Sequence, residues 1–155
     1  MPNWCECDLT LHGPDTAIDD FIQKTRGPET LLFFSAAVPP PVGLDELLDK
    51  REWAYKHWGT NREASLEEDN EWVREAGKAS LFFMTAWSPP IEWLIAVSRL
   101  HPELEISLDY DEPGMDFGGL VKAMRGELVV LTETRSRFNT WLLAQEEQDE
   151  AAKRA

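Results

Sequence analysis

The stretch Leu104-Glu105-Ile106-Ser107-Leu108-Asp109-Tyr110-Asp111 alternates apolar with acidic or polar side chains without a break. Successive side chains of a β-strand point to opposite faces, so this alternation indicates a strand with one face in the core and the other in solvent. Residues 4–11 alternate in the same way. Their apolar face carries Cys5, Cys7, Leu9 and Leu11, and the two segments predict strands of a sheet covered on one side.

Turn residues divide the rest of the chain into further elements. Two short, continuously apolar runs, residues 31–38 and 80–87, predict buried strands. One helix is expected to start with Asp15 or Thr16 as its N-cap and to end at Gly27. Another is expected to start with Ser88 as its N-cap and Pro89 at its first position. The remaining predicted elements are a helix over 45–57, strands over 117–124 and 127–134, and a terminal helix from about 139.

This order of elements predicts an α+β fold of the ferredoxin-like plan: a mainly antiparallel sheet with helices on one face, extended by a C-terminal hairpin plus helix. Chain length argues for a single domain over 1–155, with a helical insertion at about 41–77 and a polar tail at about 145–155. The runs 31–38 and 80–87 are apolar on both faces, so the far face of the sheet needs a cover. The insertion, the terminal helix and a homodimer are the three alternatives.

Composition and charge exclude several classes of function. The chain has 155 residues, with 29 acidic and 15 basic side chains and a net charge of -14. Phosphate backbones and anionic membranes are bound through Lys and Arg, so neither direct nucleic-acid binding nor membrane binding is expected. No apolar segment is long enough to cross a bilayer and the N-terminus lacks a secretory signal, so we expect a cytoplasmic protein. Two cysteines supply neither a disulfide framework nor a zinc site, and no metal or cofactor is expected.

Four motifs stand out in the first 125 residues or so: Met1-Pro2-Asn3-Trp4-Cys5, Trp58-Gly59-Thr60, Thr85-Ala86-Trp87-Ser88-Pro89-Pro90, and Tyr110-Asp111-Glu112-Pro113-Gly114 with Phe117 and Gly119. Together they resemble the YubB-like family of phage- and plasmid-encoded proteins with a ferredoxin-like domain. The resemblance implies a fold and a mobile-element setting but no activity, because none is established for that family. The chain departs from the family pattern at Cys7 and at residues 61–63, where Asn-Arg-Glu replaces Lys-Trp-Asp.

Carboxylates around the strand at 104–110 form the first candidate site. Same-face residues of a strand lie about 6.6 Å apart, so their carboxylates would form a regular row that imitates a phosphate backbone. Alternatively, the row is only the solvated face of an edge strand, where its charge prevents aggregation. We therefore expect a non-enzymatic module that binds a basic protein partner. One form of this hypothesis is a nucleic-acid mimic that inhibits a host factor. This acidic surface comprises Glu103, Glu105, Asp109, Asp111, Glu112 and Asp116.

An aromatic pocket for a small ligand or a substrate is the alternative site. Packing of the insertion against the open sheet face explains the same side chains more simply. No nucleophile motif, phosphate loop or zinc-binding helix motif occurs, so we assign no catalytic residue. RNA binding on the sheet face would share the fold plan, but the basic character is missing. The residues of this aromatic set are Trp53, Tyr55, His57, Trp58, Thr60 and Trp87.

Overall fold

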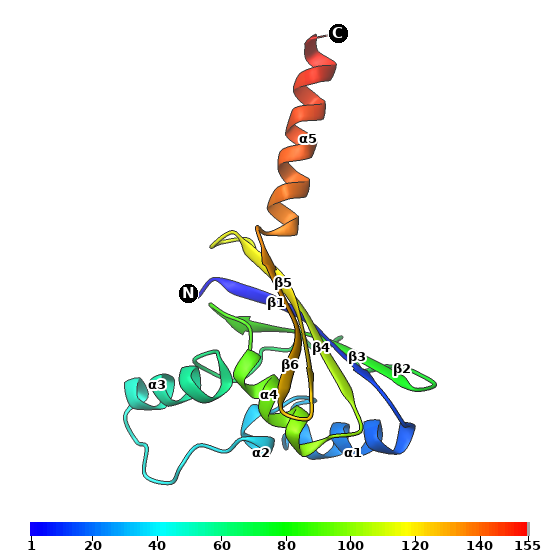
Figure 1. The fold of residues 1–155 in the computed structure, drawn as a ribbon. Coiled ribbons are helices and arrows are strands. Elements are labelled where there is room, and N and C mark those ends of the chain that lie inside the picture. The colour runs from blue at the N-terminus through cyan, green and yellow to red at the C-terminus, as the bar shows by residue number, and fades with distance from the viewer. Residues whose placement is uncertain (155) are drawn as a thin grey trace.

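A computed structural model describes residues 1–154 of the chain, which form one antiparallel sheet in the order β2-β3-β1-β4-β5-β6 and a set of helices (Figure 1). The strands are β1 (Trp4–His12), β2 (Val73–Glu75), β3 (Lys78–Ala86), β4 (Glu105–Glu112), β5 (Phe117–Met124) and β6 (Glu127–Thr134). The helices are α1 (Asp15–Thr25), α2 (Phe34–Ala37), α3 (Leu47–Trp58), α4 (Ile91–Leu100) and α5 (Arg137–Arg154).

The ferredoxin-like plan occupies the strand order β2-β3-β1-β4, with α1 following β1 and α4 joining β3 to β4. This confirms the predicted fold class. The hairpin of β5 and β6 extends the sheet, and α2 and α3 are inserted between α1 and β2. Figure 1 shows α1 to α4 gathered on one side of the sheet, whereas α5 extends away from it.

The two alternating segments form the centre of the sheet. β1 pairs with β3 on one side and with β4 on the other, so Cys7 lies between Phe83 and Tyr110. All three side chains are buried on the face that the helices cover. Burial raises the pKa of the Cys7 thiol well above its usual range, and contact with Cys5 raises it further. Cys7 is therefore a protonated, unreactive core residue.

Helix α4 contributes the largest fully buried side chain, Trp93. Its ring centroid lies 4.9 Å from that of Phe34 and 6.2 Å from that of Phe21. Phe21 belongs to α1 and Phe34 begins α2. Trp93 of α4 therefore packs against α1 and α2 on the core side of the sheet.

The predicted strand at residues 31–38 is wrong. This segment is a loop followed by the single turn of α2, and the missing strand of the ferredoxin-like order is β2, inside the predicted insertion. Phe34 is buried without joining the sheet. The backbone N–H groups of Phe34 and Ser35 donate to the Glu63 carboxylate at 2.5 and 3.1 Å, so a side chain replaces a strand partner. Periodicity alone does not separate a buried strand from another buried apolar segment.

The predicted helix caps are also wrong. Neither α1 nor α4 has a side-chain cap at its N-terminus. The Asp15 carboxylate instead accepts the N–H of Gly77 at 2.8 Å, and the Ser88 hydroxyl donates to the carbonyl of Gly59. Residues 145–154, expected as a polar tail, continue α5 as a helix, and residue 155 lies outside the described residues.

The far face of the sheet is covered by neither of the two predicted elements. α3 packs against α4 and so lies on the core side, and α5 points away (Figure 1). The far face therefore presents acidic and polar side chains of β1 and β4 beside Phe82 and Met84 of β3. A homodimer through this face stays a prediction.

We expect Gly119→Ala to destabilise the fold by about 1–3 kcal/mol, as overpacking does elsewhere. Gly119 lies in β5 beside Tyr110 of β4. An added Cβ would lie 2.6 Å from the Tyr110 hydroxyl and closer still to the carbonyl oxygen of Thr132. Because the carbonyl belongs to the neighbouring strand, the sheet itself must shift. Urea unfolding measures the loss.

Gly114→Ala is the matched control for that substitution. The three atoms nearest to its added Cβ all belong to the side chain of Asn3, which can swing aside. A Gly119→Ala protein as stable as the Gly114→Ala protein would contradict the expected clash.

Candidate binding surfaces

The predicted row of carboxylates is largely engaged within the protein. Glu105 and Asp109 lie on the far face of β4, and Glu103 precedes the strand. Lys122 pairs with Glu105 at 2.9 Å. Arg137, the first residue of α5, forms an ion pair with Asp109.

Asp111 holds the start of α5. Its carboxylate accepts hydrogen bonds from the Ser136 hydroxyl at 2.8 Å, the Arg137 N–H at 2.8 Å and the Phe138 N–H at 3.4 Å. These backbone groups belong to the first turn of a helix, where N–H groups lack partners within the helix and favour negative charge. The side chain is only 7% exposed, so Asp111 serves as a buried anchor.

Asp116 completes this anchor, whereas Glu112 holds the turn between β4 and β5. Asp116 accepts the Arg135 Nε at 2.8 Å and the Ser136 N–H at 3.2 Å. Hydrogen bonds from Arg135 and Asn139 lower the pKa of Asp116. Glu112 is fully buried and accepts the Met115 N–H at 3.1 Å. Asp111 and Glu112 are thus buried, contrary to the expectation that both belong to an exposed acidic surface.

The remaining negative charge of the far face is concentrated where β1 meets β4. Asp8 of β1 lies directly opposite Asp109 of β4. Desolvation and the facing Asp109 carboxylate raise the pKa of Asp8, while Arg137 lowers it. A carboxyl group whose pKa is raised on folding binds its proton more tightly in the folded state, so its ionisation opposes folding.

We expect Asp8→Asn to raise the melting temperature at neutral pH, where Asp8 is charged. The advantage should shrink as the pH falls toward about 3, where Asp8 is protonated in the folded and unfolded chains alike. Thermal unfolding followed by circular dichroism at both pH values measures the difference. Asp69→Asn, in an exposed loop, is the control for the change in net charge. An Asp8→Asn protein less stable than the parent at neutral pH would contradict the account.

The aromatic set does not form one pocket. Thr60 is fully buried and donates its hydroxyl to the Ala86 carbonyl at 2.8 Å. Tyr55 is exposed on another side of α3, where it borders a hollow formed with Gly59 and Ser88. Trp87 is 43% exposed, in a left-handed conformation with φ of 70°.

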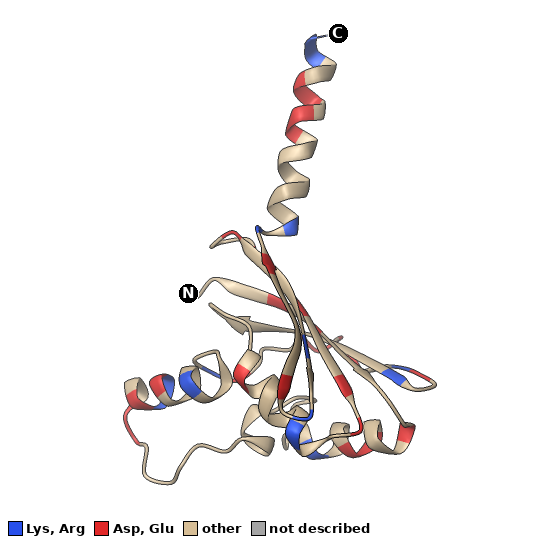
Figure 2. Ribbon diagram, in the orientation of Figure 1, with Lys and Arg blue, Asp and Glu red and all other residues tan. Residues whose placement is uncertain are grey.

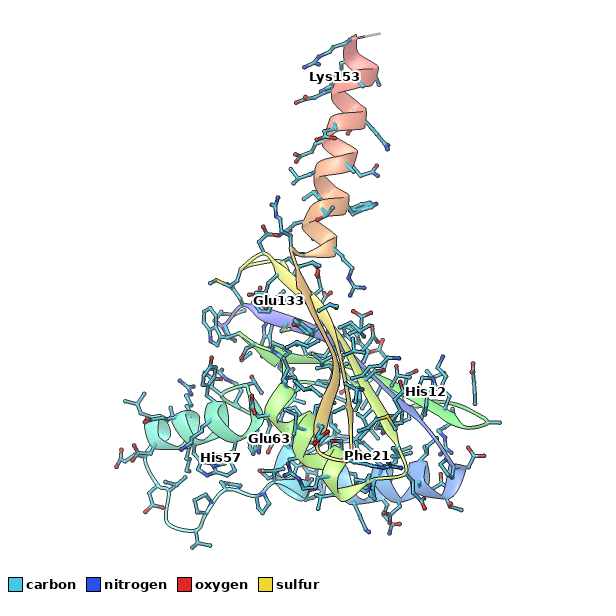
Figure 3. The ribbon with its side chains drawn as sticks, viewed as in Figure 1. His12, Phe21, His57, Glu63, Glu133 and Lys153 are labelled. Atoms are coloured by element: carbon cyan, nitrogen blue, oxygen red, sulfur yellow. The ribbon has the colours of Figure 1, made fainter. Side chains whose placement is uncertain are left out.

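Trp53 and Trp58 do line one cavity, between α3 and residues 33–44. The cavity measures about 370 Å³. Trp58 is buried and donates its indole N–H to the Val38 carbonyl at 2.9 Å, which fixes the loop to the helix. His57 stacks on Trp53 with 4.5 Å between ring centroids, and its side chain is exposed (Figure 3). The structure therefore brings Trp53 and Trp58 together in one cavity but does not gather the whole aromatic set there.

The sequence predicted a terminal helix from about residue 139, but not that helix α5 continues to Arg154 or that it lacks packing against the rest of the chain. It runs for 18 residues, and none of its side chains is buried. Phe138, Trp141 and Leu142 are exposed apolar residues at positions i, i+3 and i+4, on one side of the helix. Figure 2 shows acidic residues in the outer half of α5, and in Figure 3 Lys153 lies well away from the sheet. The signal was the apolar spacing itself, followed by acidic residues that looked like a solvated tail.

Comparison with known proteins supports the same fold. Residues 63–154, more than half of the chain, match the family model described as the ferredoxin-like domain in Api92-like protein. The crystal structure of a protein Api92 from Yersinia pseudotuberculosis superposes with a TM-score of 0.69 at 10% sequence identity. The alignment covers 88% of this chain and 99% of that one. No curated protein sequence matches the chain significantly.

Across residues 1–154, every helix is too short or too polar to cross a bilayer.

Proposed function

We propose that this chain, which belongs to the family of Api92-like proteins with a ferredoxin-like domain, is a non-enzymatic protein-binding module. The proposal retains the basic partner expected from the sequence but moves the docking element to α5. The observation that carries it is an 18-residue helix fixed at its start and without a buried side chain.

The stability of α5 supports this role. Most helical stability in proteins comes from packing of an apolar face, and isolated helices of this length are marginal in water. α5 has an apolar face but no core to place it in. Asp111 and Asp116 stabilise only its first turn. A partner that covers Phe138, Trp141 and Leu142 would supply the missing packing.

The charge of α5 indicates the chemistry of that partner. Beyond the apolar residues, the helix carries Glu146, Glu147, Asp149 and Glu150. Of these, only Glu150 lies within salt-bridge distance of a basic group in residues 1–154, at 3.9 Å from Arg154. An amphipathic helix of this kind fits an apolar groove with a rim of Lys and Arg. A second copy is a poorer match, because each chain carries a net charge of -14.

Site-specific photocrosslinking of the full chain tests the proposal. A benzophenone amino acid replaces Trp141 in one protein and Leu48, an exposed apolar residue of α3, in the control. We expect Trp141 to give one crosslinked protein from the source cells that is absent at Leu48. That protein should be basic, and its yield should fall with added salt and with Glu146→Gln and Glu147→Gln.

Three outcomes would contradict the proposal. The first is no crosslink from Trp141, and the second is the same products from both positions. The third is a crosslink only to a second copy of this chain, which would make α5 a self-association element. Sedimentation of the purified protein identifies that last case independently.

We also propose a YubB-like origin in a phage or plasmid, inhibition of a host factor, and a cytoplasmic location. We do not propose that the row around β4 imitates nucleic acid, because residues at the start of α5 and Lys122 already bind most of its carboxylates. Arg135 likewise forms an ion pair with Asp116.

A further inference from the structure

The cavity between α3 and residues 33–44 has a mainly apolar wall. On the helix side this wall consists of Trp53, Ala54 and Trp58. On the loop side it consists of Phe33, Pro40, Pro41 and Leu44. A volume of about 370 Å³ lies in the size range of small-molecule sites, which are mostly apolar with a few placed polar groups. Two indole rings in the wall favour a flat ligand, since rings pack by offset or edge contacts.

Basic side chains border the same cavity. Lys50 and Arg51 reach it from α3, and Arg62 reaches it from the segment that follows the helix. Within residues 1–154, none of the three makes a salt bridge. The chain has almost twice as many acidic as basic residues, so three cations around one cavity without an acidic partner are unusual.

The one carboxylate at the cavity, Glu63, is already occupied. It accepts the N–H groups of Phe34 and Ser35, and the Ser35 hydroxyl at 2.6 Å. Arg62 donates its Nε to the Asn61 side chain at 2.9 Å, which orients the guanidinium and leaves its terminal N–H groups free. Glu63 thus holds the loop, while the arginines retain capacity for a ligand.

We infer that this cavity binds a small organic acid in which a carboxylate or phosphate is attached to a flat apolar body. The body lies against Trp53 and Trp58, and the acid group meets Arg51 and Arg62. A guanidinium donates two parallel hydrogen bonds to either kind of acid, so the pair of arginines recognises their shared geometry. This site is independent of α5 and of the partner proposed for it.

Calorimetric titration of the full chain with three probes of one ring system tests the inference. The probes are 1-naphthyl phosphate, 1-naphthoate and neutral 1-naphthol. We expect one site for at least one acid, with 1-naphthol binding about 10-fold or more weakly because charge-assisted hydrogen bonds are lost. The relative affinity of the two acids tells whether the site prefers phosphate or carboxylate.

Charge-neutralising variants locate the site. Arg51→Gln combined with Arg62→Gln should weaken binding of the preferred acid about 10-fold or more, with an unchanged melting temperature. Lys56→Gln, on the same helix but outside this cavity, should bind like the parent chain. Trp141→Ala should also bind normally, which excludes adsorption of the ring to α5.

The inference is overturned if neither acid binds, or if 1-naphthol binds as tightly as the acids. It is equally overturned if the double arginine variant keeps the parent's affinity. Trp53→Ala tests the apolar wall separately. Loss of the indole ring should weaken the binding of both acids without changing which of them binds more tightly.

Discussion

Replacing Trp93 with alanine is expected to destabilise the protein by about 3–5 kcal/mol, a large part of the 5–15 kcal/mol typical of a domain. The ring is fully buried against Phe21 and Phe34, and its N–H points to the Phe34 carbonyl at 3.3 Å. Its loss leaves a cavity where three helices meet, and the helices cannot close it without leaving the sheet. Urea unfolding of the two proteins measures the difference.

Trp87→Ala is the matched control. The residue type and the substitution are the same, but Trp87 lies at the surface, where changes usually stay within about 0.5 kcal/mol. The left-handed backbone at residue 87 is equally unfavourable for tryptophan and alanine, so Trp87→Ala does not change the backbone strain of the parent protein. Equal losses from Trp93→Ala and Trp87→Ala would contradict the arrangement of the core.

Trp141→Ala is expected to weaken partner binding at least about 30-fold, as truncation of a central tryptophan commonly does at interfaces. The side chain is 55% exposed and its ring centroid lies 6.0 Å from that of Phe138, so the two rings form one apolar surface. Because no side chain of α5 is buried, the melting temperature should stay the same. Titration against the protein recovered by crosslinking measures the affinity.

Leu48→Ala provides the control for that measurement. Leu48 is 77% exposed and apolar but lies on α3. Its removal should leave the affinity unchanged. A Trp141→Ala protein that binds as tightly as the Leu48→Ala protein would remove α5 from the interface.

The central strands were predictable because their alternation has a direct physical cause. Each of β1 and β4 buries one face, and the register of the pairing places those faces together. The hairpin between the predicted strands at 117–124 and 127–134 was also predictable, because a glycine, Gly126, lies between them and readily adopts the positive φ that a tight hairpin requires.

The errors arose where a side chain replaced a backbone partner. The apolar run at 31–38 looks like a buried strand, but Glu63, about 30 residues later, satisfies its N–H groups. β2 has only three residues, all exposed, so no apolar pattern marks it. The spacing of nearby residues reveals neither the Glu63 contact nor the pairing of β2, because both depend on contacts between segments distant in the sequence.

The candidate sites failed for a related reason. Spacing along β4 correctly placed carboxylates on one face, but it does not show that Ser136 and Arg137 return to them. The aromatic set was chosen from residues close together in the sequence of α3, but neighbouring residues of a helix point to different sides. Trp53 and Tyr55 consequently lie on different surfaces.

Hydrogen exchange of the purified full chain measures how far the α5 amides are protected when no partner is present. If α5 is a docking element without packing of its own, its amides should exchange far faster than those of β1, at every protein concentration. Addition of the crosslinked partner should then slow the exchange of α5. Protection of α5 as strong as that of β1 in the isolated monomer would contradict the claim, because the helix would then already be packed against its own chain.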